Sequence, residues 1–237
     1  MNQTKKFINY AHRGASEYTP ENTFLAFYTG LFMNANGIET DVQKTKDGIL
    51  VLFHDDTLKR VTGEEGSVAD YTFEELQAFS VKKDKFSDKI VMFEDFLKKF
   101  AFRDITFAIE LKFEGYEKET AELIYKYHAE NKVIITSFNF NCLVNIKKCA
   151  PGLKTGFLTD NDNEETFEKM KKADVFEYCP KAAIITKEKV NVWHKNGFNV
   201  RAWGVYDEEL MKMSYEAGVD GMTVNFPDKL YNYIKKQ

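Results

Sequence analysis

Three acidic side chains have the types and the spacing of a metal site. Glu39 and Asp41 end one strand-like segment two residues apart, and Glu110 ends a short apolar segment, two residues before Lys112. Side chains alternate across a β-strand, so residues two apart share one face. If these faces meet, three carboxylates converge. Three oxygen ligands with room for water suit one hard divalent cation, Mg²⁺ or Ca²⁺, better than zinc, which more often recruits histidine or cysteine.

Two histidines and two cationic side chains could act beside that cation. His12 and Arg13 end an apolar segment near the N-terminus, and His54 and Lys112 end two others. A hard cation next to arginine and lysine forms a site for a phosphate oxyanion. Two imidazoles, with an ordinary pKa of about 6.5, can share the acid and base roles near neutral pH. The residue types therefore predict chemistry at a phosphate group.

An Asp47-Gly48 turn between two strand-like segments should return His54 to the acidic pair. Asp-Gly is the strongest short-range signal for a two-residue hairpin loop. Ideal pairing across such a loop places His54 directly opposite Asp41. A bulge in the hairpin would shift this register.

Each feature also has a purely structural interpretation. A His-Arg-Gly sequence is usually a loop, paired acids on a strand are usually a solvated face, and Glu110 with Lys112 could be an exposed ion pair of little energy. The functional interpretation is favoured because one fold places all of these residues on one rim. The remaining histidines, His128 and His194, lie in helical segments and are expected to be structural.

That fold is predicted from strands that alternate with helices. The alternation favours a parallel sheet, and eight strand–helix pairs in 237 residues favour closure into a single α/β domain, a (β/α)8 TIM barrel. Barrel enzymes carry their chemistry at the C-terminal ends of the strands, where these polar residues are expected. An open doubly wound sheet is the alternative, but the sequence has no Gly-rich phosphate loop after its first strand.

The expected elements follow the whole chain. Strands should begin near Phe7, Gly37, Ile105, Lys132, Leu153, Asp174, Phe198 and Val219. Helices should span residues 20–35, 94–102, 116–131, 140–149, 163–172, 187–196, 207–217 and 227–235. We expect Thr19 to cap the first helix, with Pro20 at its first position, and Asp207 to begin the seventh.

One stretch interrupts the alternation. Residues 55–93, between the second strand and the second barrel helix, contain a short helix near residues 71–79 and a charged segment at 82–89. The stretch is too short for an independent domain. We therefore expect residues 1–237 to form one domain, with an insertion at about 55–93 over one mouth of the barrel.

Composition narrows the class of protein. Hydrophobic residues make up 43% and charged residues 30% of the chain, as in ordinary globular proteins, and the net charge of -4 argues against a nucleic-acid partner. Cys142, Cys149 and Cys179 are odd in number without CxxC spacing, which favours a reducing compartment. Residues 1–10 lack a signal-peptide core, and no apolar run is long enough to span a bilayer. We expect a cytoplasmic protein without stable membrane insertion; the oligomeric state stays open.

Several motifs resemble the signature of the glycerophosphodiester phosphodiesterase family. The resemblance covers nearly the whole chain and is most specific in the N-terminal block. The motifs are His12-Arg13-Gly14, Pro20-Glu21-Asn22-Thr23, Ile38-Glu39-Thr40-Asp41-Val42, Thr45-Lys46-Asp47-Gly48, His54-Asp55, Glu110-Leu111-Lys112, Ser137-Phe138, Ala202-Trp203 and Gly218-Val219-Asp220-Gly221.

The resemblance implies a (β/α)8 barrel that binds one divalent cation. The roles that it implies are metal ligands for Glu39, Asp41 and Glu110, the acid/base pair for His12 and His54, phosphate clamps for Arg13 and Lys112, and the glycerol or alcohol pocket for Phe138 and Trp203. The two aromatic residues could equally be ordinary side chains of the barrel interior.

Two positions depart from the family pattern. Asn225 stands where the family often has aspartate, which puts a charged role at this position in doubt. Gly204 follows Trp203 where the family commonly has threonine, a change that would reshape the pocket. The predicted ligands and histidines are untouched, so we expect activity to survive.

The implied reaction is hydrolysis of glycerophosphodiesters, such as glycerophosphocholine, to sn-glycerol 3-phosphate and an alcohol. Either water or the substrate's own glycerol hydroxyl could be the nucleophile. One alternative is lysophospholipase D-like activity on lysolipids, which the charged segment at residues 82–85 disfavours. The other is a non-catalytic barrel that binds phosphorylated ligands, which the complete set of histidines and acids disfavours.

Overall fold

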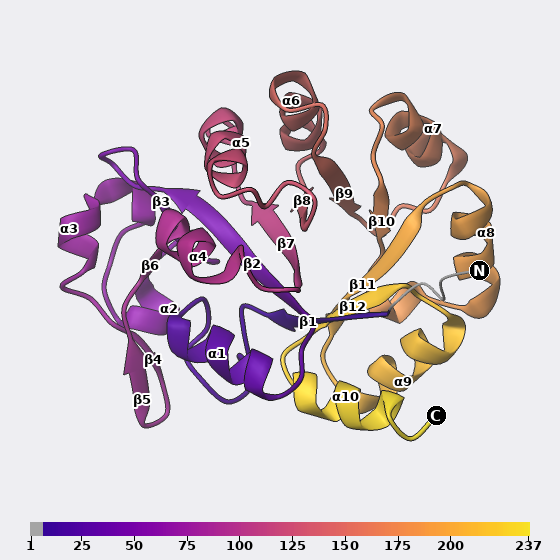
Figure 1. Cartoon of the computed structure of the whole chain (residues 1–237), viewed down its shortest axis with the longest axis horizontal. Helices are drawn as coiled ribbons and strands as arrows, with labels where there is room; N and C mark the ends of the chain where they lie inside the picture. Colours follow the sequence, from indigo (N-terminus) through magenta and orange to yellow (C-terminus); the bar gives the residue numbers. More distant parts are fainter. Residues whose placement is uncertain (1–6) are drawn as a thin grey trace.

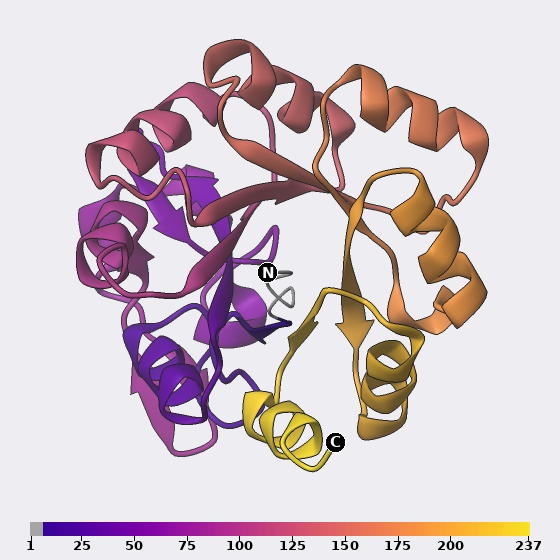
Figure 2. The same ribbon diagram turned by 45° about the vertical axis from the view of Figure 1, so that its right-hand side comes forward.

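Eight parallel strands close into a ring in the computed structural model, which describes residues 7–237. Strands follow one another around the ring in chain order, and β1 pairs with both β12 and β2. They are β1 (Ile8–His12), β2 (Gly37–Lys44), β7 (Thr106–Leu111), β8 (Val133–Ser137), β9 (Lys154–Leu158), β10 (Glu177–Cys179), β11 (Asn199–Val205) and β12 (Gly221–Val224). Figure 2 shows helices outside this ring. The predicted (β/α)8 barrel is confirmed.

The outer helices match the expected segments closely, except the first and the third; the third ends at Lys126 instead of residue 131, so His128 lies beyond it. They are α1 (Phe24–Phe32), α4 (Phe93–Phe100), α5 (Glu117–Lys126), α6 (Phe140–Cys149), α7 (Glu164–Lys172), α8 (Lys187–Lys195), α9 (Glu208–Ala217) and α10 (Pro227–Ile234). As expected, Asp207 caps α9 by accepting a hydrogen bond from the Leu210 amide at 2.8 Å.

The predicted start of the first helix is wrong. Thr23, not Thr19, is the N-cap of α1, and its hydroxyl accepts a hydrogen bond from the Ala26 amide. The residues before it form a loop because Asn22 adopts a φ of 56° and turns its side chain toward the barrel, where its Nδ2 donates to Asp41. Pro20, Glu21 and Asn22 therefore precede α1 and are not part of it.

Aromatic packing holds α1 and α4 against the strand that carries Glu110. The ring of Phe96 lies 5.0 Å from that of Phe27 in α1 and 5.5 Å from that of Phe107 in β7, measured between centroids. All three side chains are fully buried. Burying each contributes roughly 1.5–3 kcal/mol. This cluster fixes β7, the strand that carries Glu110.

The insertion lies beside the barrel, at the left of Figure 1. It follows β3 (Leu50–Leu52) and contains α2 (Lys59–Thr62), a 3₁₀ turn (Val68–Asp70), α3 (Phe73–Leu76), β4 (Val81–Lys83), β5 (Phe86–Asp88) and β6 (Val91–Met92). The expected helix is shorter than residues 71–79, and the charged segment forms the antiparallel β4–β5 hairpin. Asp88 at its end accepts a hydrogen bond from the Leu25 amide of α1 at 3.0 Å. The insertion thus joins the flank of the barrel next to α1.

The predicted register of the β2–β3 hairpin is off by one residue. Val42 pairs with Leu52, and the Phe53 amide donates to the Asp41 carbonyl at 3.0 Å, so Phe53 and not His54 lies opposite Asp41. The connection has three residues, 46–48, instead of two. Gly48 closes it with a φ of 85°, a conformation that favours glycine.

Within residues 7–237, no helix has the length and apolar character needed to cross a membrane. The segment in which we expected no signal-peptide core, residues 1–10, lies mostly outside the described residues. The cytoplasmic location stays a prediction.

Candidate active site

A pocket at the C-terminal ends of the strands brings the predicted residues together. Those that line it directly are His12, Arg13, Glu39, His54, Glu110, Phe138 and Trp203. The other two predicted residues, Asp41 and Lys112, contact members of this group. All nine predicted side chains therefore gather at this end of the barrel.

The three acidic residues meet in a geometry that fits a cation. Oxygen atoms of Glu39, Asp41 and Glu110 all lie within 4.8 Å of one another, and the three residues are buried. Asp41 and Glu110 are direct partners across β2 and β7. Asp41 Oδ1 is buried without a hydrogen-bond partner among the described residues. This donor set fits a hard divalent ion.

The pKa shifts of the acidic residues also favour a bound cation. Burial, and then repulsion from Asp41 and Glu110, raises the pKa of Glu39 well above its ordinary value. Burial and the Asp41 charge also raise the pKa of Glu110. Since like charges cause part of both shifts, a bound cation would favour the ionised forms of both carboxyl groups.

Two cationic side chains contact the same carboxylates. Lys112 Nζ lies 2.8 Å from Glu110 Oε1 and 3.6 Å from Asp41 Oδ1, and Arg13 Nε lies 3.3 Å from Asp41 Oδ2. Although burial opposes it, the charges of Arg13 and Lys112 hold the pKa of Asp41 well below its usual range. Asn22 Nδ2 donates to Asp41 Oδ2 at 2.9 Å, which fixes the carboxylate further.

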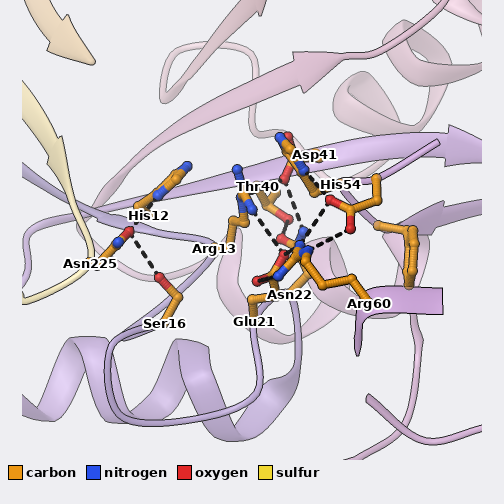
Figure 3. A network of polar contacts seen from close by, with 12 residues as sticks. His12, Arg13, Ser16, Glu21, Asn22, Thr40, Asp41, His54, Arg60 and Asn225 are labelled. Carbon is orange, nitrogen blue, oxygen red and sulfur yellow. Dashed lines mark hydrogen bonds and ion pairs between the residues drawn. The ribbon is translucent and has the colours of Figure 1, made fainter. Parts of the chain in front are cut away.

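His12, the last residue of β1, is held by the side-chain amide of Asn225. Its Nδ1 lies 2.5 Å from Asn225 Oδ1, an oxygen that also accepts from Ser16 Oγ at 3.1 Å (Figure 3). An amide oxygen only accepts, so Nδ1 carries the proton. His12 Nε2 then lies 3.9 Å from Glu39 Oε2. Burial, and then the Arg13 charge, lowers the pKa of His12 to about 3, so the imidazole is neutral at physiological pH.

His54 is held by a carboxylate instead. Its Nδ1 lies 2.6 Å from Oδ1 of the adjacent Asp55. Although burial raises it, hydrogen bonds from Arg60 and His54 lower the pKa of Asp55 to about 2. An ionised carboxylate only accepts, so His54 also carries its proton on Nδ1. Both histidines thus keep Nε2 available to a bound molecule.

Sequence reasoning missed the side chains that support His54 and Arg13. Glu21 lies in the segment expected to begin the first helix. Arg60 lies in the insertion, where no strand pattern predicts the position of its side chain. Arg60 in α2 donates hydrogen bonds to Glu21 and to Asp55. Glu21 and Asp55 belong to the motifs that resemble the family signature, whereas Arg60 has only its spacing of five residues from Asp55, which is a weak signal.

Aromatic rings form one wall of the pocket. Phe138 and Trp203 meet edge to face with centroids 4.9 Å apart, and Phe138 is 50% exposed. Tyr206, which was not predicted, lines the same pocket and is 66% exposed. Gly204 lies between Trp203 and Tyr206 in the sequence and has a φ of 67°. The pairing of β11 with β12 shifts register at this point. The two predicted aromatic residues therefore face the pocket.

A buried ion pair underlies the pocket and was also missed. Arg201 Nε lies 2.8 Å from Glu177 Oε2, and both side chains are 1% exposed. Arg201 also donates to Thr223 Oγ1 at 2.6 Å, and Asn199 Nδ2 donates to Glu177 Oε1 at 2.8 Å. These bonds join β10, β11 and β12 inside the barrel. Charged residues in the middle of predicted strands were the signal.

Comparisons with known proteins place the chain among phosphodiesterases. Residues 12–229 match the family described as "Glycerophosphoryl diester phosphodiesterase family". A glycerophosphodiester phosphodiesterase of Caldanaerobacter subterraneus subsp. tengcongensis is 35% identical over 98% of this chain and 99% of its own length. A relative of the same name from Bacillus altitudinis is 34% identical over 93% of this chain and 95% of its own length.

Solved structures agree on the fold. A solved structure from Silicibacter pomeroyi superposes with a TM-score of 0.89 at 22% identity, covering 99% of this chain and 95% of the other. An Oleispira antarctica phosphodiesterase, solved with the product sn-glycerol-3-phosphate, gives a TM-score of 0.85 at 24% identity over 96% of each chain.

Proposed function

The chain belongs to the glycerophosphoryl diester phosphodiesterase family, and from this premise we propose that it hydrolyses glycerophosphodiesters to sn-glycerol 3-phosphate and an alcohol. The observation that carries the proposal is that His12 and His54 line one pocket with Glu39 and Glu110. The product bound to the Oleispira antarctica relative supports the same reaction. Deacylated phospholipids such as glycerophosphocholine are the substrates that we propose.

We propose that Glu39, Asp41 and Glu110 hold one divalent cation, Mg²⁺ or Ca²⁺. Two observations support this role: their oxygens converge, and Asp41 Oδ1 accepts no hydrogen bond among the described residues. When bound, such an ion would polarise a phosphate oxygen and neutralise charge that develops in the transition state. Arg13 and Lys112 are the side chains that we assign to the remaining phosphate oxygens.

The two imidazoles supply the proton transfers. One accepts the proton of the hydroxyl nucleophile at Nε2, and the other donates a proton to the leaving alkoxide. The accepting imidazole must be neutral, and burial and the Arg13 charge keep His12 neutral at physiological pH. Phe138 and Trp203 are proposed to bind the carbon skeleton of the glycerol or alcohol.

One observation keeps lysolipids in view as a second substrate class. Phe138 and Tyr206 are aromatic, lie at the pocket and are at least half exposed, so an apolar chain could contact them. The charged β4–β5 hairpin in the insertion disfavours a membrane-facing surface on that flank. We therefore place small water-soluble diesters first.

A matrix of cations and substrates tests the proposal. Purified protein is assayed with glycerophosphocholine and with lysophosphatidylcholine, each with Mg²⁺, with Ca²⁺ and after chelation, and a Glu110→Gln variant is the control. We expect cation-dependent release of sn-glycerol 3-phosphate from glycerophosphocholine. Faster release of choline from lysophosphatidylcholine would support the lysolipid alternative. Binding without turnover under every condition would show a phospho-ligand-binding barrel instead.

A further inference from the structure

Arg60 binds two carboxylates at the edge of the pocket. Its guanidinium donates to Glu21 at 2.7 and 2.8 Å and to Asp55 at 2.5 and 2.9 Å. A planar guanidinium can engage carboxylates through parallel pairs of hydrogen bonds, which an ammonium group cannot reproduce. The side chains of Glu21 and Asp55 are only 16% and 20% exposed. The two carboxylates are therefore less exposed to solvent than those of an ordinary surface ion pair.

Each carboxylate leads to a different part of the site. Asp55 holds Nδ1 of His54 at 2.6 Å. Glu21 Oε1 accepts from Arg13 at 2.9 Å, and Arg13 lies 3.3 Å from the carboxylate of Asp41. Together with Arg60 these residues form one continuous chain of contacts, and Figure 3 labels all of its members except Asp55. Arg60 is the member that joins the histidine end of the network to the Arg13 end.

We propose that Arg60 is a positioning residue for the reaction: through Asp55 it fixes the orientation and tautomer of His54, and through Glu21 it fixes Arg13. The inference rests on the proposed function, because it assigns Arg60 to the two groups that would act on the phosphate. Arg60 itself does not line the pocket, so it acts through its partners.

The geometry explains why the two carboxylates need a cation between them. Ligand-type atoms of Glu21, His54 and Asp55 lie within 4.8 Å of one another. Without Arg60 the two carboxylates would repel, and Asp55 would turn toward solvent and release His54. These three residues are of metal-ligand types, but the guanidinium already donates to both carboxylates. The observations therefore favour a hydrogen-bonded support over a second metal site.

Two substitutions at this position separate charge from geometry. Arg60→Gln removes the charge, and Arg60→Lys keeps the charge but not the planar fork. Lys59→Gln is the matched control, because Lys59 lies on the same short helix and pairs with Glu65 at the surface. Supporting residues of this kind typically contribute 10–100-fold to activity. We expect both Arg60 variants to lose about 10–100-fold in kcat, whereas the control keeps wild-type kcat.

The tautomer of His54 gives a readout that a merely structural role would not move. Nitrogen-15 NMR of the metal-free protein, assigned with His54→Gln, should show the proton on Nδ1 in the wild type and the control. In Arg60→Gln it should show a mixture of tautomers, while the melting temperature stays within a few degrees of wild type. Adding Glu21→Gln to Arg60→Gln should cost less than the product of the single losses, because both act in one network.

Several results would overturn the proposal. It fails if Arg60→Lys keeps wild-type kcat, or if Arg60→Gln leaves both kcat and the His54 tautomer unchanged. It also fails if the tautomer changes only together with loss of the fold. If the wild-type protein turned over no glycerophosphodiester, the proposed function would fail, but the NMR comparison would still decide whether Arg60 orients His54.

Discussion

Nδ1 of His12 lies 2.5 Å from Oδ1 of Asn225, across the seam where the last strand of the barrel pairs with the first. Closure of the ring therefore orients a predicted catalytic side chain. The amide accepts from the imidazole without adding a negative charge. Position 225 therefore carries no charge in this protein, but its side chain still forms a hydrogen bond with His12.

Asn225→Asp should raise the pKa of His12. In the wild type, burial and the Arg13 charge lower it to about 3, and a carboxylate at 225 would stabilise the imidazolium. An NMR titration of His12 in metal-free protein measures the change. We expect His12 to titrate at a higher pH in the variant; an identical midpoint would show that the Asn225 contact does not set the ring's charge.

The same shift makes a prediction about acid stability. An unfolded histidine protonates near pH 6.5, whereas folded His12 stays neutral to about pH 3. Between these values the unfolded state binds more protons, so His12 lowers the stability of the fold as pH falls from 6.5. His12→Gln should therefore lose less stability than wild type between pH 7 and pH 5 in denaturant titrations. An equal or larger loss would contradict the neutral assignment.

Loss of either pocket histidine should slow turnover without unfolding the protein. Replacing His12 or His54 with glutamine should each lower kcat by about 10²–10⁴-fold, because proton transfer by a positioned side chain contributes that much. His128→Asn is the control, since His128 is exposed and its φ of 53° is one that asparagine tolerates. A histidine variant that kept wild-type kcat would remove that residue from the acid/base pair.

The ion pair beneath the pocket should be sensitive to the loss of one partner. Arg201→Met leaves the Glu177 carboxylate buried without its cation, which typically costs about 3–5 kcal/mol. Adding Glu177→Gln removes the stranded charge and keeps an acceptor for Asn199, so stability should largely return. Chemical denaturation measures both variants. Equal stability of the single and double variants would contradict this interpretation.

Gly14 should tolerate no side chain. Its φ is 83°, and a Cβ would lie 2.4 Å from the Ala26 backbone carbon of α1. Left-handed strain and the clash together predict a cost of about 2–5 kcal/mol for Gly14→Ala. Gly197→Ala is a matched control: its φ is 91°, but a Cβ would meet nothing within 4 Å, so only the strain applies. Equal losses in denaturant unfolding would show that close packing against α1 is unimportant.

The sequence predicted those parts of the site that follow from strand periodicity. Glu39, Asp41 and Glu110 could be placed because alternation and barrel closure leave few other arrangements. The hairpin register could not, since one more residue in its loop moves Phe53 into the expected place of His54. Arg60 and Glu21 were missed because irregular segments bring them together, and no periodicity relates such segments.

A crystal structure of the protein soaked in Mn²⁺, a hard divalent ion with a strong anomalous signal, tests most directly whether the three carboxylates form a metal site. We predict one anomalous peak at about 2.0–2.6 Å from oxygens of Glu39, Asp41 and Glu110, absent from a Glu110→Gln crystal. No peak among these residues at saturating Mn²⁺, or a peak only at Glu21 and Asp55, would contradict it.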